Sequence, residues 1–344
     1  MAWDLIFKSL SSAEDLSSDQ ITWAMGQILE GQASDDQIKQ FLLGLKAKGE
    51  SAAEVQALVS QMYSYCAPIS ISERAVDTVG TGGDGANTIN ISTTAAIITN
   101  AAGARVVKHG NRAASSKSGA ADLLEALGIK IDLTGSEVEQ TVHKIGIGFC
   151  FAPIFHSSMK HAASARKELG TPTIFNILGP LANPAKAVAC AIGVARAELL
   201  PLISQVLLEQ GKEGFVFRGD DGMDEVTLTG PTTVYEIAKG GRVKASISPE
   251  DFGISRAAIE DLRGGDGAEN ATRIKAVFAG ETGAPRDAIL LNSAITLVAY
   301  NLNIDSEKSL VERVAEQIKV AEKAIDSGAA TALVEKWSQI SNSL

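Results

Sequence analysis

Apolar positions in residues 1–67 recur at the spacing of α-helices. Ser17, Ser34 and Ser51 each stand three positions before a Gln or Glu, a pairing typical of a capping box at a helix start. Each serine precedes an apolar stripe with a period of three to four residues, and Pro68 ends the series. The pattern predicts a small all-helical N-terminal domain over residues 1–67, whose simplest role is packing or subunit contact.

From residue 74 onward, short apolar runs alternate with helical patterns. The runs predict strands at residues 75–79, 105–108, 129–133, 148–151, 187–194 and 214–217. The helical patterns lie at residues 121–127, 197–210, 270–278, 288–300 and 306–325. This alternation is typical of an α/β domain, so we expect a large α/β domain with a mainly parallel central sheet.

Composition narrows the class of protein. The chain has 344 residues, 45% hydrophobic and 21% charged, which allows one large domain and a smaller one. It has no apolar run of membrane-spanning length and no basic, apolar leader, so we expect neither a membrane span nor a signal peptide. The 3 cysteines are odd in number and far apart, which favours buried thiols in a reducing cytoplasm. A net charge of −10 argues against nonspecific nucleic-acid binding.

A glycine-rich loop follows the first predicted strand. Its glycines are Gly80, Gly82, Gly83 and Gly85. Such a loop before a helix N-terminus favours an anion such as phosphate, although plain turns share this composition. The spacing matches neither the dinucleotide fingerprint nor the Walker loop, and no lysine follows. Asp84 would repel a bare phosphate, but it is compatible with ribose hydroxyls or with a metal bound to pyrophosphate.

A second polar loop, residues 108–119, follows the next strand. It combines three cations, Lys108, Arg112 and Lys117, with an amide and several serines. This mixture suits a diphosphate or a ribose 5-phosphate, the alternative being a solvated surface loop. Because the carboxyl ends of parallel strands share one edge of a sheet, both loops are expected to line one site.

Candidate metal ligands and a candidate cation lie further along the chain. Asp224 and Glu225 are adjacent, and a pair of desolvated carboxylates needs a cation such as Mg²⁺; an acidic surface turn is the alternative. His156 and His161 are five positions apart, which does not place them on one helix face. Arg166 lies in a basic helical stretch that is equally compatible with a solvent-facing surface.

Taken together, these stretches resemble the anthranilate phosphoribosyltransferase family. Residues 77–85 read D-T-V-G-T-G-G-D-G, and residues 108–119 read K-H-G-N-R-A-A-S-S-K-S-G. The F-N-I-L-G-P-L-A-N-P of residues 175–184 and the G-M-D-E of residues 222–225 are also similar, and the resemblance covers nearly the whole chain. It implies a Mg²⁺-dependent glycosyltransferase of tryptophan biosynthesis, which moves the phosphoribosyl group of phosphoribosyl pyrophosphate to anthranilate and releases diphosphate.

The resemblance also implies site residues. Phosphoribosyl pyrophosphate would be held by Gly80, Gly83, Asp84, Thr88, Asn90, Ile91, Ser92, Thr93, Lys108, His109, Gly110, Asn111, Arg112, Ala113, Ala114, Ser115, Ser116 and Ala120. Anthranilate would contact Gly80, Asn111 and Arg166, with Arg166 facing its carboxylate. Ser92, Asp224 and Glu225 would hold Mg²⁺, with two ions expected per chain. No strong general base is implied.

The family fold implies a helical domain completed by about residues 165–185, which leaves residues 74–164 and 186–344 to the α/β domain. It also implies a homodimer formed through the helical domain. Two departures stand out: Ala120 replaces a serine that many members have near the phosphate, and the stretch before Arg166 lacks the prolines often found there. We expect both to alter packing or affinity rather than to abolish activity.

Three other functions compete with this one. A pyrimidine nucleoside phosphorylase shares the fold and a T-G-G loop, but the K-H-G-N-R stretch and the D-E pair favour the transferase. Inactive relatives that bind nucleic acid should carry a basic groove, whereas this chain is acidic and keeps Asn111 and Arg166. A helical scaffold without chemistry would leave both polar loops unexplained.

Overall fold

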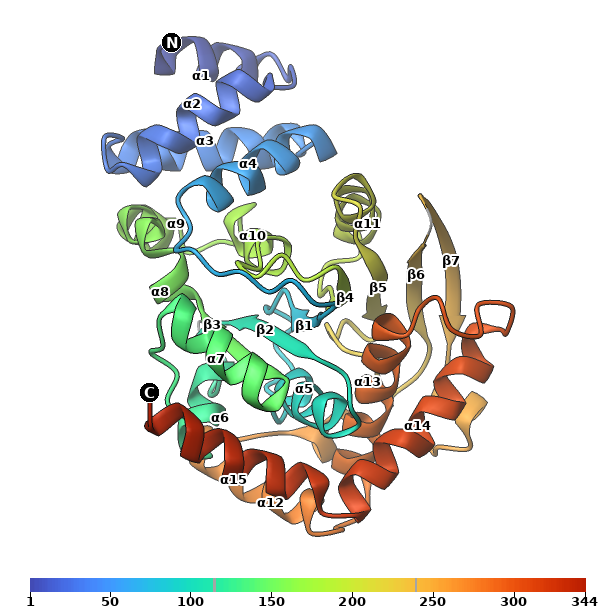
Figure 1. Cartoon of the computed structure of the whole chain (residues 1–344). Helices are drawn as coiled ribbons and strands as arrows, with labels where there is room; N and C mark the ends of the chain where they lie inside the picture. The colour runs from blue at the N-terminus through green and yellow to red at the C-terminus, as the bar shows by residue number, and fades with distance from the viewer. Residues whose placement is uncertain (114–115, 239) are drawn as a thin grey trace.

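The computed structural model describes residues 1–113, 116–238 and 240–344, and its N-terminal helices stand above a larger α/β part (Figure 1). These helices are α1 (Trp3–Ser11), α2 (Ser18–Leu29), α3 (Asp35–Lys48) and α4 (Ala52–Ser64). Ser17, Ser34 and Ser51 each close a complete capping box, so the three predicted helix starts are confirmed. In the described chain α1 has no side-chain cap, which explains why the capping signature did not reveal it.

The α/β part is built on a 7-stranded sheet in the order β3-β2-β1-β4-β5-β6-β7. The strands are β1 (Val76–Gly80), β2 (Val106–Gly110), β3 (Ile147–Phe151), β4 (Ala189–Gly193), β5 (Glu213–Gly219), β6 (Thr232–Ala238) and β7 (Gly241–Ile247). The first five strands are parallel to their neighbours, and β6 and β7 are added antiparallel at one edge. The mainly parallel sheet is therefore confirmed, with an antiparallel hairpin that the apolar pattern did not predict.

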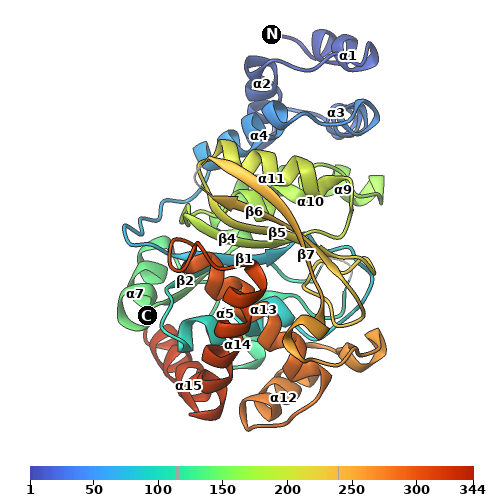
Figure 2. The same cartoon turned by 90° about the vertical axis from the view of Figure 1, so that its right-hand side faces the viewer.

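Helices cover both faces of this sheet. α11 (Leu199–Glu209) packs on β5 and β6 from the side of the N-terminal helices, whereas α5 (Ile91–Ala101) and α13 (Ala284–Tyr300) cover the opposite face (Figure 2). Strand residues alternate between the two layers. Phe215 and Phe217 join the hydrophobic cluster beneath the sheet, while Val216 joins the cluster that includes the N-terminal helices. The central strands therefore contribute side chains to both hydrophobic layers, one on each face of the sheet.

Between β3 and β4 the chain returns to the N-terminal helices. It forms α8 (Ala152–Phe155), η1 (Ser157–Ala162), α9 (Ala163–Leu169) and α10 (Phe175–Leu181). α9 packs against α3, where the Nζ atom of Lys39 lies 2.7 Å from a Glu168 carboxylate oxygen. Phe175, Ile177 and Leu178 of α10 join the same hydrophobic cluster as α2, α3 and α4. Residues far apart in sequence thus build this helical layer together.

The remaining helices lie around the sheet and at the C-terminus. They are α6 (Ala120–Ala126), α7 (Gly135–Ile145), η2 (Pro249–Phe252), η3 (Ile259–Leu262), α12 (Gly267–Phe278), α14 (Leu310–Asp326) and α15 (Ala329–Asn342). Across the residues that the structure describes, no helix combines the length and the apolar character needed to cross a membrane.

The strand predicted at residues 129–133 is wrong. Ile129, Ile131 and Leu133 are buried, as the alternation requires, but the segment forms no ladder with the described strands. Its backbone meets a helix instead, since the Lys130 N–H donates to the Ser341 hydroxyl near the end of α15 at 3.0 Å. Alternating burial identified an extended segment, but not its hydrogen-bonding partner.

Candidate active site

The strand order reverses beside β1, so a ligand crevice is expected at the strand ends there. From β1 the chain continues to β2 and β3 on one side, and then crosses to β4 and β5 on the other. Gly80 and Gly193, at the carboxyl ends of β1 and β4, are register partners, and the Thr81 N–H donates to the Gly193 carbonyl at 3.0 Å. In open α/β sheets, ligands bind outside the strand ends at such a reversal.

Asp224 lies directly over these two strand ends. Its segment follows β5, and the Gly82 N–H donates to Asp224 Oδ2 at 2.6 Å. A β-carbon at Gly80 would overlap Asp224 Oδ2, and one at Gly193 would overlap the Asp224 backbone carbonyl. The two glycines are therefore required by this close approach, which sets a carboxylate at the mouth of the crevice.

Gly80→Ala tests this close approach. The added methyl group must push the Asp224 carboxylate aside and break its bond with the Gly82 N–H. We expect kcat/KM of the reaction proposed below to fall by about 10- to 100-fold, since a displacement of about 1 Å has this effect on a positioned group. Gly241→Ala is the control, because its methyl group would make only an ordinary contact at 3.8 Å. Equal rates for both variants and the parent chain would show that the carboxylate position is unimportant.

The glycine-rich loop owes its shape to backbone conformation. Gly82, Gly83 and Gly85 have φ values of +68°, +84° and +74°. Around each of their β-carbon positions there is no heavy atom of the described residues within 4 Å, so conformation rather than crowding requires glycine. Asp84 accepts the Ala86 N–H at 3.1 Å, which fixes the turn. Thr88 then pairs with Arg263 in an isolated bridge.

The start of α5 carries the next group of predicted site residues. The Ser92 N–H donates to Glu225 Oε1 at 3.2 Å, so Glu225, the second predicted metal-binding carboxylate, contacts the N-terminus of α5. Asn90 accepts hydrogen bonds from the Ser118 hydroxyl at 3.0 Å and from the Asn270 amide at 2.8 Å. These bonds join the first loop to the second. Two further predicted residues, Ile91 and Thr93, are buried in the core.

Lys108 lies beneath the crevice. Its side chain is 2% exposed and its ammonium donates to the Thr78 carbonyl, two residues before Gly80. Burial lowers the pKa of Lys108, while the charges of Asp77, Glu225 and Asp224 oppose that shift. Lys108 therefore braces the end of β1 and balances part of the negative charge around it.

His109 is held neutral inside the protein. Its Nδ1 lies 2.9 Å from the Gly179 carbonyl, so Nδ1 carries the proton and Nε2 is an acceptor. Burial, with help from His156, lowers the pKa of His109 to about 3. Nε2 has no hydrogen-bond partner among the described residues. This unsatisfied acceptor is enclosed where β2 packs against α10.

The rest of the second loop is only partly described. Ala114 and Ser115, both predicted to hold substrate, lie outside the described residues. Asn111 accepts the Arg112 N–H at 2.8 Å, and the Ser116 hydroxyl donates to the Ser118 carbonyl at 3.3 Å. A β-carbon at Gly110 would lie 3.1 Å from that of Ala120, so these two predicted residues are neighbours.

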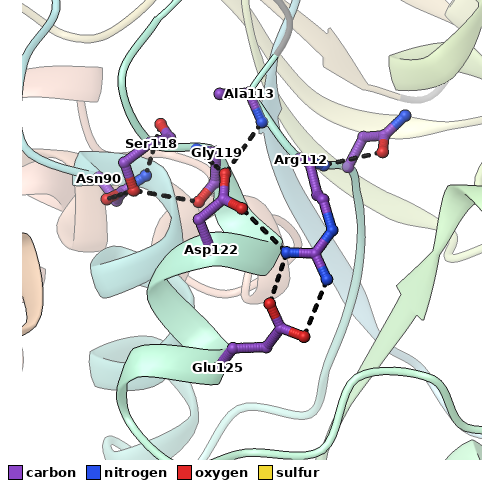
Figure 3. A network of polar contacts seen from close by, with 8 residues as sticks. Asn90, Arg112, Ala113, Ser118, Gly119, Asp122 and Glu125 are labelled. Atoms are coloured by element: carbon purple, nitrogen blue, oxygen red, sulfur yellow. Dashed lines mark hydrogen bonds and ion pairs between the residues drawn. The ribbon is translucent and has the colours of Figure 1, made fainter. Parts of the chain in front are cut away.

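The Arg112 side chain points to α6. Its guanidinium contacts Asp122 and Glu125 on that helix (Figure 3). The side chain therefore follows the outer surface of the loop rather than the crevice over β1 and β4.

The two adjacent carboxylates fit a divalent cation. Asp224 and Glu225 are each 9% exposed. Burial, with the nearby Asp84, raises the pKa of Asp224 to about 7, and burial with Asp224 raises the pKa of Glu225 well above its usual value. Lys108 alone cannot balance this charge. Within the described ranges no group of three His, Cys, Asp or Glu side chains could hold a metal alone, so substrate oxygens would complete the coordination, as is usual for Mg²⁺.

Arg166 lies on a short helix that packs against α3. It belongs to α9, and no hydrogen bond or ion pair among the described residues joins it to either loop. By surface area the residue is exposed, although protein around the guanidinium lowers its pKa by desolvation. The guanidinium is therefore accessible to solvent and stays charged at physiological pH. No carboxylate of the described residues pairs with Arg166, which leaves its charge available.

Three supporting residues were not predicted from the sequence. Asn270 of α12 is fully buried and fixes Asn90 from 180 positions away. Asn183 donates to the buried Asp77 carboxylate at 2.8 Å, and Gly193 admits the Asp224 segment. Gly193 could have been noticed, because a glycine ends the apolar pattern of β4. Asn183 and Asn270 could not, because no local pattern indicates a hydrogen-bond partner far away in the sequence.

Comparison with known proteins agrees with this architecture. Residues 5–66 match the helical bundle domain of a glycosyl transferase family, and residues 72–331 match the α/β domain of the same family. The anthranilate phosphoribosyltransferase of Arthrobacter sp. (strain FB24) is 48% identical, over 97% of this chain and 95% of that protein. The enzyme of that name from Streptomyces griseus is 46% identical, over 99% and 96%.

Solved structures give the same result. Anthranilate phosphoribosyltransferase from Thermus thermophilus superposes with a TM-score of 0.90 at 35% identity, covering 98% of this chain and 99% of that one. The Saccharomyces cerevisiae enzyme, solved in complex with phosphoribosyl pyrophosphate and Mg, has a TM-score of 0.90 at 29% identity, covering 99% and 98%. The reversal of strand order, the two polar loops and the buried carboxylate pair thus occur in a chain that belongs to the anthranilate phosphoribosyltransferase family.

Proposed function

We propose that this chain transfers the phosphoribosyl group of phosphoribosyl pyrophosphate to anthranilate, giving N-(5-phosphoribosyl)anthranilate and diphosphate, the second step of tryptophan biosynthesis from chorismate. One observation carries the proposal. Two buried carboxylates, whose charge Lys108 balances only in part, accept the Gly82 N–H of the first loop and the Ser92 N–H at the start of α5, beside the strand-order reversal. Such a site is built for a metal shared with a diphosphate.

The diphosphate substrate is proposed to lie between the two loops. The residues that would hold it are Gly80, Gly83, Asp84, Thr88, Asn90, Ile91, Ser92, Thr93, the segment from Lys108 to Ser116, and Ala120. The bonds of Asn90 with Ser118 support this arrangement, because they fix the two loops side by side. Anthranilate would contact Gly80, Asn111 and Arg166.

The chemistry then depends on charge and position. Cleavage of the bond between ribose C1 and diphosphate develops negative charge on the leaving group. Mg²⁺ held by Ser92, Asp224 and Glu225 would neutralise that charge as it develops on the diphosphate oxygens. The amine of anthranilate is neutral at pH 7 and can attack directly. Lys108 holds the end of β1, so catalysis comes from positioning and electrostatics.

The proposal extends to assembly, metal content and location. We expect two Mg²⁺ ions per chain. A diphosphate has more oxygen ligands than one ion held by a single carboxylate pair can coordinate. The proposed helical domain, residues 1–67 completed by 165–185, exposes Leu5 by 57% and Leu43 by 44%, which supports a homodimer through this domain. Cys66, Cys150 and Cys190 are free thiols, as expected in the cytoplasm.

The fluorescence of anthranilate provides the test. Anthranilate is mixed with the protein, phosphoribosyl pyrophosphate and Mg²⁺, and its fluorescence is followed with time. We expect a loss of signal that needs all three components and stops on addition of EDTA. No loss with folded protein would contradict the proposal, and phosphorolysis of uridine and thymidine would then test the phosphorylase alternative.

A further inference from the structure

The Arg112 guanidinium is bound to carboxylates in the first two turns of α6. Its Nη1 donates to Asp122 Oδ1 at 3.0 Å and also to Glu125, while Nη2 donates to the second Glu125 oxygen at 2.8 Å (Figure 3). The two donors on Glu125 form a bidentate pair, which is the strongest geometry available to arginine. Two carboxylates thus share one cation, so little of its positive charge is left for another anion.

Arg112 also lines a cavity that is separate from the expected crevice. Arg112 and Glu125 line a cavity of about 440 Å³ together with Lys130, Asp132, Phe151 and Asn342. Its wall, in the described parts of the chain, includes neither Asp224 nor any residue of the glycine-rich loop. The guanidinium carbon lies 5.6 Å from the centre of the Phe151 ring, which fixes its outer side.

The pairs of Arg112 with Asp122 and Glu125 form a clamp. Asp122 connects this clamp to the second loop at two positions. Its Oδ2 accepts the Ala113 N–H at 3.0 Å and the Gly119 N–H at 2.8 Å. Ala113 precedes the partly described part of the loop, and Gly119 follows it. Ser118, beside Gly119, is bonded to Asn90 of the first loop. The position of Arg112 is therefore coupled through one carboxylate to the backbone that faces the proposed diphosphate site.

We infer that Arg112, although it lies in the segment proposed to hold phosphoribosyl pyrophosphate, is a positioning residue rather than a diphosphate ligand. Its pairs with Asp122 and Glu125 hold the second loop in shape for that substrate. The inference rests on the proposed function and deepens it. The loop would contribute its backbone and Asn111 to the substrate, whereas the Arg112 side chain is bound to α6. Loss of the clamp makes the loop mobile, and ordering it again is added to the cost of binding this one substrate.

Glu125→Ala is the decisive variant. We expect KM for phosphoribosyl pyrophosphate to rise by about 10-fold, with kcat and the KM for anthranilate within about 2-fold of the parent chain. Arg112→Ala also loses the pair with Asp122, so it should raise the KM for phosphoribosyl pyrophosphate at least as much, and the double variant no more than Arg112→Ala, because Glu125 acts only through Arg112. Arg112→Lys should recover only part, since an ammonium group cannot form the bidentate pair. Glu335→Ala, an exposed glutamate on α15, is the matched control.

A different pattern of KM changes would show that the inference is wrong. If Arg112 binds the diphosphate directly and Glu125 merely competes for it, Glu125→Ala lowers the KM for phosphoribosyl pyrophosphate while Arg112→Ala raises it. An unchanged KM for Glu125→Ala would also overturn the inference. Circular dichroism checks the fold of each variant, and Glu125→Gln, which keeps the shape, should show a smaller rise in the same direction. An inactive parent chain would instead contradict the proposed function.

Discussion

Phosphoribosyl transfer is expected to stop when Asp224→Asn is combined with Glu225→Gln. The two amides keep the shape of the carboxylates but remove both charges that would hold Mg²⁺. We expect kcat/KM at ordinary Mg²⁺ concentrations to fall on the order of 1,000-fold, because a metal supplies several kcal/mol of charge stabilisation. The fluorescence assay measures this loss. Asp220→Asn is the control, since Asp220 lies in the same acidic segment but accepts a hydrogen bond from the Thr233 hydroxyl.

The stability of this double variant separates lost chemistry from lost folding. Burial raises the pKa of Asp224 from 3.8 to about 7, so the folded protein favours the protonated carboxyl. A raised acidic pKa means that the fold loses stability as pH rises from about 4 to 7, and neutral amides avoid that loss. In EDTA at pH 8, the double variant should therefore unfold no earlier on heating than the parent chain. Near-normal rates in this variant would remove both residues from the metal site.

Arg166→Ala should act on anthranilate alone. A guanidinium without a carboxylate partner among the described residues can bind the carboxylate of this substrate, and such a charged hydrogen bond contributes about 1.5–3 kcal/mol. We expect the KM for anthranilate to rise by about 10- to 100-fold, with the KM for phosphoribosyl pyrophosphate changed by less than about 3-fold. Initial rates at varied concentrations of each substrate measure both.

Two further variants test the specificity of that effect. Lys167→Ala removes a neighbouring exposed cation from the same helix and should leave both KM values unchanged. Arg166→Lys keeps the charge without the planar donors and should fall between the parent chain and Arg166→Ala. An unchanged KM for anthranilate in Arg166→Ala would exclude Arg166 from that site.

The sequence predicted features with strong local signals. The serine caps at Ser17, Ser34 and Ser51 depend on contacts three residues apart, so the pattern contains the whole interaction. The two loops were also identifiable, since glycines and clustered polar residues followed apolar strands. Their proximity followed from the rule that parallel strands end at one edge, and the Asn90–Ser118 bonds show the loops in contact.

Other features depended on partners that no local pattern specifies. Strand β7 is largely exposed at the edge of the sheet, with Val243 67% exposed, so it has no buried alternation to detect. Residues 129–133 had the alternation but pack beside α15. The direction of Arg112 was equally hidden, because a cation in a polar loop gives no sign that Asp122 and Glu125 will bind it.

The return of the chain from β3 to the N-terminal helices has a consequence for synthesis. Phe175 and Leu178 complete the apolar cluster that Phe41 and Leu58 begin, so the first four helices leave one apolar face of this cluster uncovered when they emerge from the ribosome. At about 5–20 residues per second, that face waits on the order of ten seconds for its partner segment. During this interval it is a natural substrate for a nascent-chain chaperone, and the N-terminal region should fold late although it is made first.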